Sequence, residues 1–161
     1  MLASFFFEEK GMSRSFEKHE RAVRLLVESG ADLENQPYHY TPLAYAAYQG
    51  NEGVVRYLIA RGARVNADAE RGGTYINTPL MMAAIQGHER IARLLLTAGA
   101  DADVRVYGGH TAAEFAAKYN HRELAQLIQC AQRQYGSAPV GVNCRAMLGY
   151  DPASRTATLR R

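Results

Sequence analysis

Two stretches of the 161-residue chain place a histidine directly before a glutamate and ahead of an apolar run, as many zinc hydrolases do. These pairs are His19-Glu20 and His88-Glu89. A zinc site of that kind needs a second histidine four residues after the first, and valine and alanine stand at those positions. We therefore predict no metal there. We expect His88 and His121 to hydrogen-bond across turns, and the two glutamates to lie in the first turns of helices, where the helix dipole favours an acid.

Other catalytic signatures are incomplete. The glycine pairs in "RGGT" from Arg71 and "YGGH" from Tyr107 lack the spacing of phosphate-binding loops, so they are better explained as turn tips. The chain has no Gly-x-Ser-x-Gly nucleophile motif. Cys130 and Cys144 have no histidine nearby in sequence, and we expect them to be free thiols in a reducing compartment. We predict no catalysis, no cofactor and no metal.

Charge is distributed unevenly along the chain. The net charge is +3, but the part from Gln132 onward holds five arginines and one aspartate, which leaves the first 131 residues at −1. A nucleic-acid reader would carry a concentrated basic face on its fold, so we expect no nucleic-acid partner. The "MLASFFFEEKGMSRS" opening is too short an apolar run for a secretory signal, and no later stretch could cross a membrane. We expect a cytoplasmic protein, and the predominance of arginine over lysine hints at a bacterial genome.

The two histidine-glutamate stretches are corresponding parts of an internal repeat. Three segments align, starting at Thr41, Thr78 and Thr111, at separations of 37 and 33 residues. A weaker copy precedes them, in which Lys18 corresponds to Gly50 and Gly87. The stretches beginning at Lys18 and Gly87 therefore occupy the same position two repeats apart.

Each repeat is predicted to form a helix, a tight turn and a second helix. Thr41 and Thr78 suit an N-cap, because the hydroxyl accepts from an unpaired N–H of the first turn, and a proline follows at the first helical position. Paired alanines allow close packing of the short first helices, and Gly50 and Gly87 can end them in the left-handed conformation. The second helix carries an apolar stripe that only a neighbouring repeat can bury.

The segment "TPLMMAAIQGHERIARLLLTAGAD" resembles an ankyrin repeat, with Thr-Pro-Leu, paired alanines, Gly-His and a leucine-rich helix that ends in Gly-Ala-Asp. The resemblance covers about residues 8–134, as three good units and a degenerate first one. Ala44, Met81 and Glu114 replace the family's Thr-Pro-Leu-His histidine, and Thr111 is followed by alanine instead of proline. The resemblance implies an all-α solenoid of helix-turn-helix units joined by β-hairpin-like loops. We predict an N-terminal capping region over 1–17, the array over 18–134 and a flexible basic tail over 135–161.

The resemblance also implies a protein-binding concave face, formed by the hairpin tips and the exposed side of the first helices. Tyrosine recurs at these places, and tyrosine is common in interface hot spots. The second connection is about four residues longer than the family spacing, so we expect Glu70, Arg71, Thr74 and Tyr75 to form a protruding finger. Tyr45, inside its helix, is interpreted as a core or groove residue. The remaining predicted contacts are Tyr38, His39, Tyr40, Tyr48, Ile85, Tyr107, Lys118 and Tyr119.

We therefore predict a monomeric protein-binding module, an adaptor or inhibitor, without catalysis. Two alternatives remain open within this class: a regulator or immunity-type protein for a neighbouring enzyme, and a secreted effector that acts in a host. A third, a small enzyme or metal protein, comes from another class. The identity of the partner does not follow from the fold.

Overall fold

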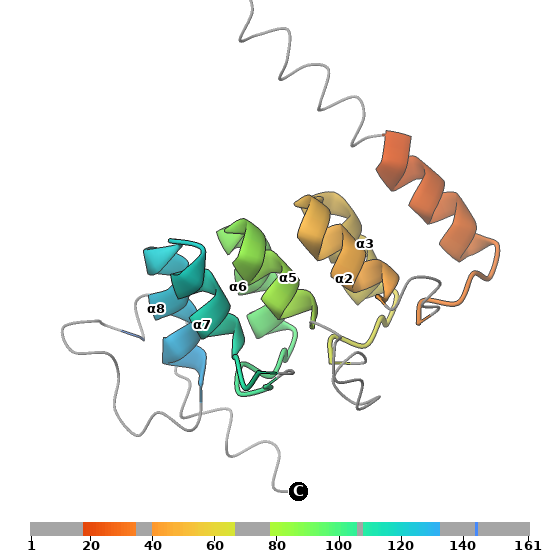
Figure 1. Cartoon of the computed structure of the whole chain (residues 1–161). Coiled ribbons are helices and arrows are strands. Elements are labelled where there is room, and N and C mark those ends of the chain that lie inside the picture. Colours follow the sequence, from red (N-terminus) through yellow and green to blue (C-terminus); the bar gives the residue numbers. More distant parts are fainter. Residues whose placement is uncertain (1–17, 35–39, 67–77, 106–107, 133–143, 145–161) are drawn as a thin grey trace, which may run out of the picture.

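The computed structural model describes residues 18–34, 40–66, 78–105, 108–132 and 144. Within these residues every regular element is helical, and a helix over residues 18–28 precedes three helix pairs. The pairs stand side by side in a row (Figure 1). They are α2 (Pro42–Gln49) with α3 (Glu52–Ala60), α5 (Pro79–Gln86) with α6 (Glu89–Thr97), and α7 (Ala112–Lys118) with α8 (Arg122–Ala131).

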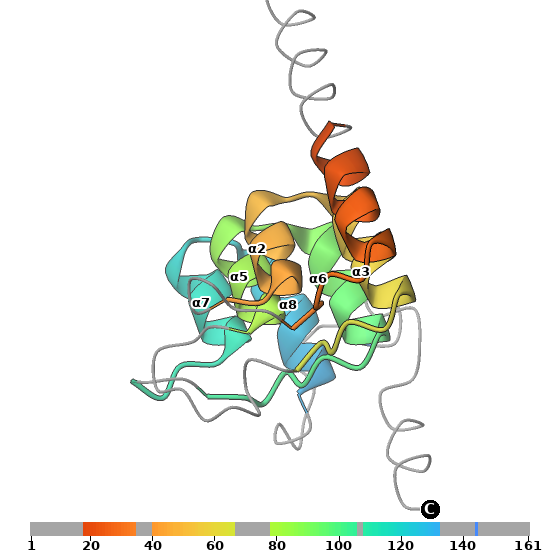
Figure 2. The same ribbon diagram turned by 90° about the vertical axis from the view of Figure 1, so that its right-hand side faces the viewer.

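The helices form two layers. The first helices of the pairs, α2, α5 and α7, pack against one another, and the second helices, α3, α6 and α8, form the other layer. Figure 2 shows these layers from the end of the row. The predicted all-α solenoid is confirmed. In the described part of the chain no helix has the length and apolar character needed to cross a membrane.

Local chemistry fixes where the first helices begin and end. Thr41 Oγ1 accepts a hydrogen bond from the N–H of Ala44 at 3.2 Å, and Thr78 does the same for Met81 at 3.3 Å. Proline follows each threonine, as predicted. Gly50 and Gly87 close the helices with φ of 76° and 75°, in the left-handed region that favours glycine.

Helix α7, the first helix of the third pair, starts without proline and uses a capping box. Thr111 Oγ1 accepts from the N–H of Glu114 at 3.3 Å, and a Glu114 carboxylate oxygen accepts from the N–H of Thr111 at 2.8 Å. Glu114 also lies 3.6 Å from the Arg105 guanidinium and 3.7 Å from His110 Nδ1. The residue that replaces the family's histidine in this repeat therefore anchors the start of its helix.

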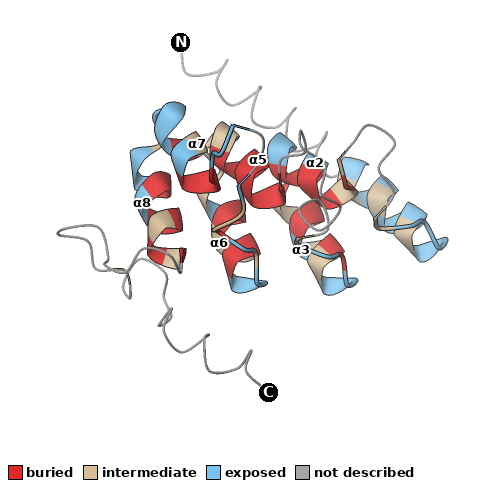
Figure 3. Ribbon diagram, turned by 60° about the horizontal axis from the view of Figure 1, so that its bottom comes forward, coloured by how far each residue is buried: buried red, intermediate tan, exposed pale blue. Residues whose placement is uncertain are grey.

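The core lies between the two layers, where the buried residues gather (Figure 3). Ala47, Ala84 and Ala116 are fully buried, which lets the first helices approach closely as predicted. On the second helices, corresponding positions hold Leu58, Leu95 and Ile128, all at most 1% exposed. Each repeat thus buries the same apolar stripe against its neighbours.

The helix over residues 18–28 departs from this pattern. Leu26 corresponds to Leu58 and Leu95, yet it is 61% exposed, and the adjacent Leu25 is 57% exposed. In the other repeats the first helix of the same pair covers this position, and the described residues contain no such helix ahead of Lys18. The predicted capping region over 1–17 lies outside the described residues.

The prediction that both cysteines are free is wrong. Cys130, in the last turn of α8, and Cys144 form a disulfide, with their Cα atoms 5.1 Å apart. That separation lies within the range of protein disulfides. The chain beyond α8 returns to this helix at Cys144, a spatial proximity that local sequence does not reveal. Apart from Cys144, the predicted tail over 135–161 lies outside the described residues.

Candidate protein-binding face

The histidines that suggested metal chemistry connect neighbouring repeats. His88 Nε2 donates to the carbonyl oxygen of Tyr48 at 3.2 Å, and His121 Nε2 donates to that of Ile85 at 3.2 Å. Both rings lie close to the glycine that ends the preceding first helix, since a Cβ atom added at Gly50 or Gly87 would lie 2.7 or 2.5 Å from the ring. The prediction that these histidines bond across turns is confirmed.

The glutamates of the two histidine-glutamate pairs, Glu20 and Glu89, form ion pairs within their own helices. Glu20 pairs with Arg24 at 2.6 Å, and Glu89 pairs with Arg93 at 2.8 Å, each four residues apart. Pairs of this kind on an exposed helix surface stabilise it weakly. Among the described residues no group of three or more acidic, histidine or cysteine side chains could hold a metal ion.

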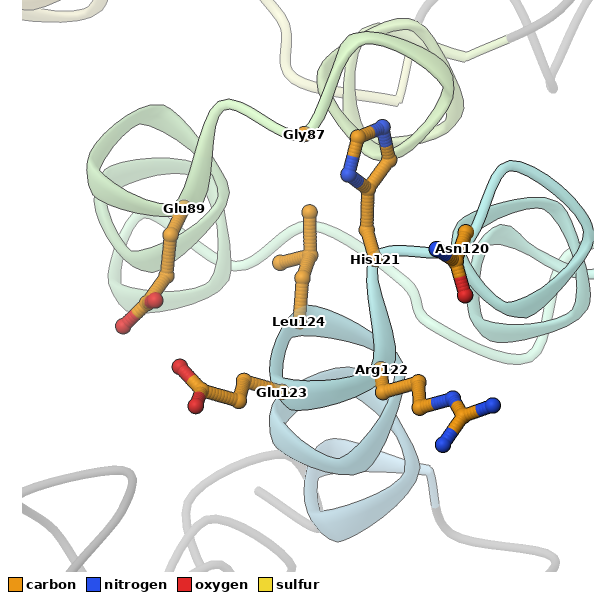
Figure 4. A pocket seen from close by; sticks show the side chains of 7 residues that line it. All are labelled: Gly87, Glu89, Asn120, His121, Arg122, Glu123 and Leu124. Atoms are coloured by element: carbon orange, nitrogen blue, oxygen red, sulfur yellow. The ribbon is translucent and has the colours of Figure 1, made fainter.

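A hollow of about 500 Å³ lies between the turns of the second and third helix pairs (Figure 4). Its wall includes Glu89, His121 and Glu123, so we considered acid–base chemistry there. The His121 ring already bonds to the carbonyl of Ile85, and Glu89 to Arg93. The hollow is therefore a groove between stacked repeats in which the His121 ring and the Glu89 carboxylate are already engaged in bonds of the fold.

Exposed aromatic side chains gather instead on the outer side of the first helices. Tyr45 and Tyr48, one turn apart on α2, are 59% and 40% exposed, and Tyr119, at the end of α7, is 48% exposed. The repeat aligns Tyr48 with Ile85 and Lys118, and Tyr45 with Met82 and Phe115. We call the surface formed by these two rows and Tyr119 the first-helix face. It runs across three helices that pack together, and it is less exposed at its middle, where Met82 is buried and Ile85 is partly buried.

The chain matches a family model described as "Ankyrin repeats (3 copies)" over residues 13–69 and again over residues 68–137. The chain belongs to the ankyrin repeat family. Domains of this family are generally protein-protein interaction modules. The first-helix face includes exposed residues of the first helices, where the family resemblance predicted partner contacts.

One curated relative of this ankyrin repeat chain is the mouse protein named "Ankyrin repeat and SAM domain-containing protein 6". The two are 41% identical over 58 residues, which is 35% of the chain and 7% of the relative. The match therefore spans a small part of that protein and extends the evidence for the repeat, while the relative's other regions have no counterpart in the alignment.

Part of the predicted ankyrin contact set is exposed on the first helices. Tyr48, Lys118 and Tyr119 are exposed on the first-helix face, with the Lys118 ammonium 6.0 Å from the Tyr119 ring centroid. Ile85 and Tyr40 are partly buried against the core. The predicted tip residues lie outside the described residues: Tyr38, His39, Glu70, Arg71, Thr74, Tyr75 and Tyr107.

Tyr45 is the residue of this face that sequence reasoning missed. Its exposed fraction of 59% rules out the core role considered for it. The signal was its spacing of three residues from Tyr48, which places both on the same side of a helix. Tyr57, by contrast, is partly buried between Arg24 and Arg61, whose guanidinium carbons lie 4.9 and 5.7 Å from its ring centroid.

Proposed function

We propose that this ankyrin repeat chain is a non-catalytic adaptor or inhibitor that binds one protein partner through the first-helix face. The observation that carries this proposal is the exposure of three tyrosines on one side of the stack, at Tyr45, Tyr48 and Tyr119. Such side chains provide large contact area with a polar end at a small cost in conformational entropy. Stacked helices hold them in place before binding, so little further ordering is needed.

The composition of the face suggests the chemistry of the partner. Gln49, Gln86 and Lys118 are exposed on the same helices and can donate hydrogen bonds, and both rows of the first-helix face lack acidic residues. A surface of apolar side chains mixed with hydrogen-bond acceptors or carboxylates would complement it. This favours a protein surface and gives no role to a cofactor or a metal.

The test is capture of partners from native lysate with the wild-type chain and with Tyr45→Ala/Tyr48→Ala/Tyr119→Ala, followed by calorimetry on the captured protein. Loss of hot-spot tyrosines should weaken binding by about 2 kcal/mol or more. The matched control is Leu25→Ala/Leu26→Ala, which removes equally exposed apolar groups away from this face. Equal affinity of the tyrosine variant and the wild type would exclude the first-helix face.

The tip residues remain part of the proposal as a second contact region. Arg71→Ala/Tyr75→Ala should reduce affinity for the same partner without changing the melting temperature if the longer second connection contacts it. A lower melting temperature with unchanged affinity would assign these residues to folding.

Of the more specific roles considered for this protein, the disulfide supports that of a secreted effector. Disulfides persist in oxidising compartments, whereas the sequence led us to expect a cytoplasmic monomer that regulates a neighbouring enzyme. Fractionation of the native host cells, with thiols blocked at lysis, separates the two. A cytoplasmic pool with free thiols would favour the intracellular regulator, and an exported pool with the Cys130–Cys144 bond would favour the effector.

A further inference from the structure

The burial of Cys130 is exceptional for its position in the repeat. The corresponding residues of the three preceding second helices are Glu28, Ala60 and Thr97, and all three are exposed. Cys130 is only 6% exposed. On α8 itself, the residue one turn earlier, Gln126, is exposed as well. Cys130 therefore lies at a position that is exposed in the other repeats, and it differs from them in its disulfide to Cys144.

Leu127, one turn before Cys130, shows the same departure. Its counterparts Tyr57 and Leu94 are partly buried although another repeat stacks beside each of them. Leu127 has no described repeat beyond it, yet its exposed fraction is 0%. The outer side of α8 is thus covered at both positions. Cys144 is the described residue from beyond α8 that lies there, held by the disulfide.

A hydrogen bond fixes the end of α8. Gln132, which follows the helix, is 7% exposed, and its side-chain amide donates to the carbonyl oxygen of Ala102 at 3.1 Å. This bond holds the exit from α8 against the connection before α7. The disulfide then fixes Cys144, 14 positions after Cys130, against α8.

We propose that Cys130 and Cys144 form a redox-sensitive cap for the C-terminal end of the stack. A terminal repeat has one side on which nothing stacks, and that side must be polar or covered. Here Leu127 and Cys130 make it apolar, and the disulfide holds Cys144 against it. Breaking the disulfide releases Cys144 from α8 and loosens this helix, while the repeats ahead of it keep their own neighbours.

The chemistry is thiol–disulfide exchange with a dithiol reductant. Its thiolate attacks the Sγ atom of Cys144, which is more exposed than Cys130, and the Cys130 sulfur leaves as a thiolate and takes up a proton. The second thiol of the reductant then attacks the mixed disulfide and releases Cys144. The chain gains two electrons and two protons, and the reductant becomes a disulfide. A small-molecule disulfide such as glutathione disulfide reverses the reaction.

The test uses the full chain purified without reductant. Thiol titration of the unfolded protein should find no free thiol, and peptide mapping should link Cys130 to Cys144. Dithiothreitol should then speed amide exchange in α8 and leave α2 unchanged, and should lower the melting temperature by about 5 to 10 °C. Two free thiols in the untreated protein, or exchange in α8 that reduction does not alter, would overturn the proposal.

Two variants separate the disulfide from the side chains themselves. Cys144→Ser keeps the buried thiol of Cys130 and should match the reduced wild type, with or without dithiothreitol. Cys130→Ser should trap glutathione on Cys144 when treated with glutathione disulfide, because no resolving thiol remains. A Cys144→Ser variant as stable as the oxidised wild type would contradict the cap, and failure to form the glutathione adduct would contradict the exchange step.

Discussion

The imidazole Nε2 of His88 donates to the main-chain oxygen of Tyr48 at 3.2 Å, and so joins one repeat to the end of the first helix of the repeat before it. The same bond recurs one repeat later between His121 and Ile85. Tyr48 and Ile85 are neighbours in one row of the first-helix face. The histidines therefore hold in register the surface that we propose as the binding site.

Replacing His88 by alanine should destabilise the array by about 0.5 to 1.5 kcal/mol, the usual net contribution of one hydrogen bond. The free energy of unfolding in urea measures this. Arg90→Ala, at an exposed position of the same helix, is the control and should change stability by less than about 0.5 kcal/mol. Equal stability of the two variants would mean that the bond contributes nothing.

Glycine at the helix ends should be needed for two separable reasons. Gly62 and Gly87 both have positive φ, of 91° and 75°, so alanine at either should cost about 1 to 2 kcal/mol in backbone strain. Only at Gly87 would the new Cβ also meet the His121 ring, at 2.5 Å, whereas nothing lies within 4 Å at Gly62. Gly87→Ala should therefore be the more destabilising in urea unfolding.

A double variant checks that explanation. In Gly87→Ala/His121→Ala the ring is gone, so the loss should be smaller than the sum of the two single losses, as expected for residues in contact. Strict additivity would show that the ring moves aside freely and that only backbone strain acts at Gly87.

The local features of this fold were predictable because each depends on residues a few positions apart. A threonine with a following proline specifies a helix start by hydrogen bonding and a fixed φ, and Gly50 specifies an end by its left-handed backbone. The repeat then carries these features to every unit. The alignment of His88 with His121 was enough to predict that both bridge turns.

The features that the sequence did not predict belong to the first and last repeats, whose structural neighbours differ from those of the inner repeats. Leu26 has the same residue type as Leu95 and is exposed only because no described helix covers it. Cys130 and Cys144 meet because the chain returns to α8, and their separation of 14 residues has no period that would signal contact. Repetition predicts the inner units well and says little about the ends.

The start of α7 should depend on the Glu114 carboxylate as a hydrogen-bond acceptor. Glu114→Ala removes half of the capping box and should cost about 0.5 to 2 kcal/mol, the range measured for lost helix caps. Glu114→Gln keeps an acceptor for the N–H of Thr111 and should recover most of the loss. If glutamine is no better than alanine, the stabilisation comes from the charge near Arg105 and His110 instead. In that case 1 M salt should remove it.

The same repeat position should respond very differently in an inner repeat and at the N-terminal end of the array. Leu95 is 0% exposed, so Leu95→Ala removes buried methyl groups and leaves a cavity, at a cost of about 2 to 5 kcal/mol. Leu26→Ala makes the same chemical change at 61% exposure and should alter the free energy of unfolding by less than about 0.5 kcal/mol. Chemical denaturation of both variants, followed by far-ultraviolet circular dichroism, measures the difference.

The Leu26→Ala variant also tests whether this helix is covered in solution. Leu25 and Leu26 are adjacent and exposed. If another part of the chain or a second copy packs on them, Leu26→Ala removes those contacts. A stability loss for Leu26→Ala near that of Leu95→Ala, independent of protein concentration, would mean that the chain itself covers Leu25 and Leu26. A loss that grows as the protein is concentrated would indicate self-association through it. If neither loss is observed, the leucines of the N-terminal helix face solvent, and the stability of the array comes from the repeats between α2 and α8.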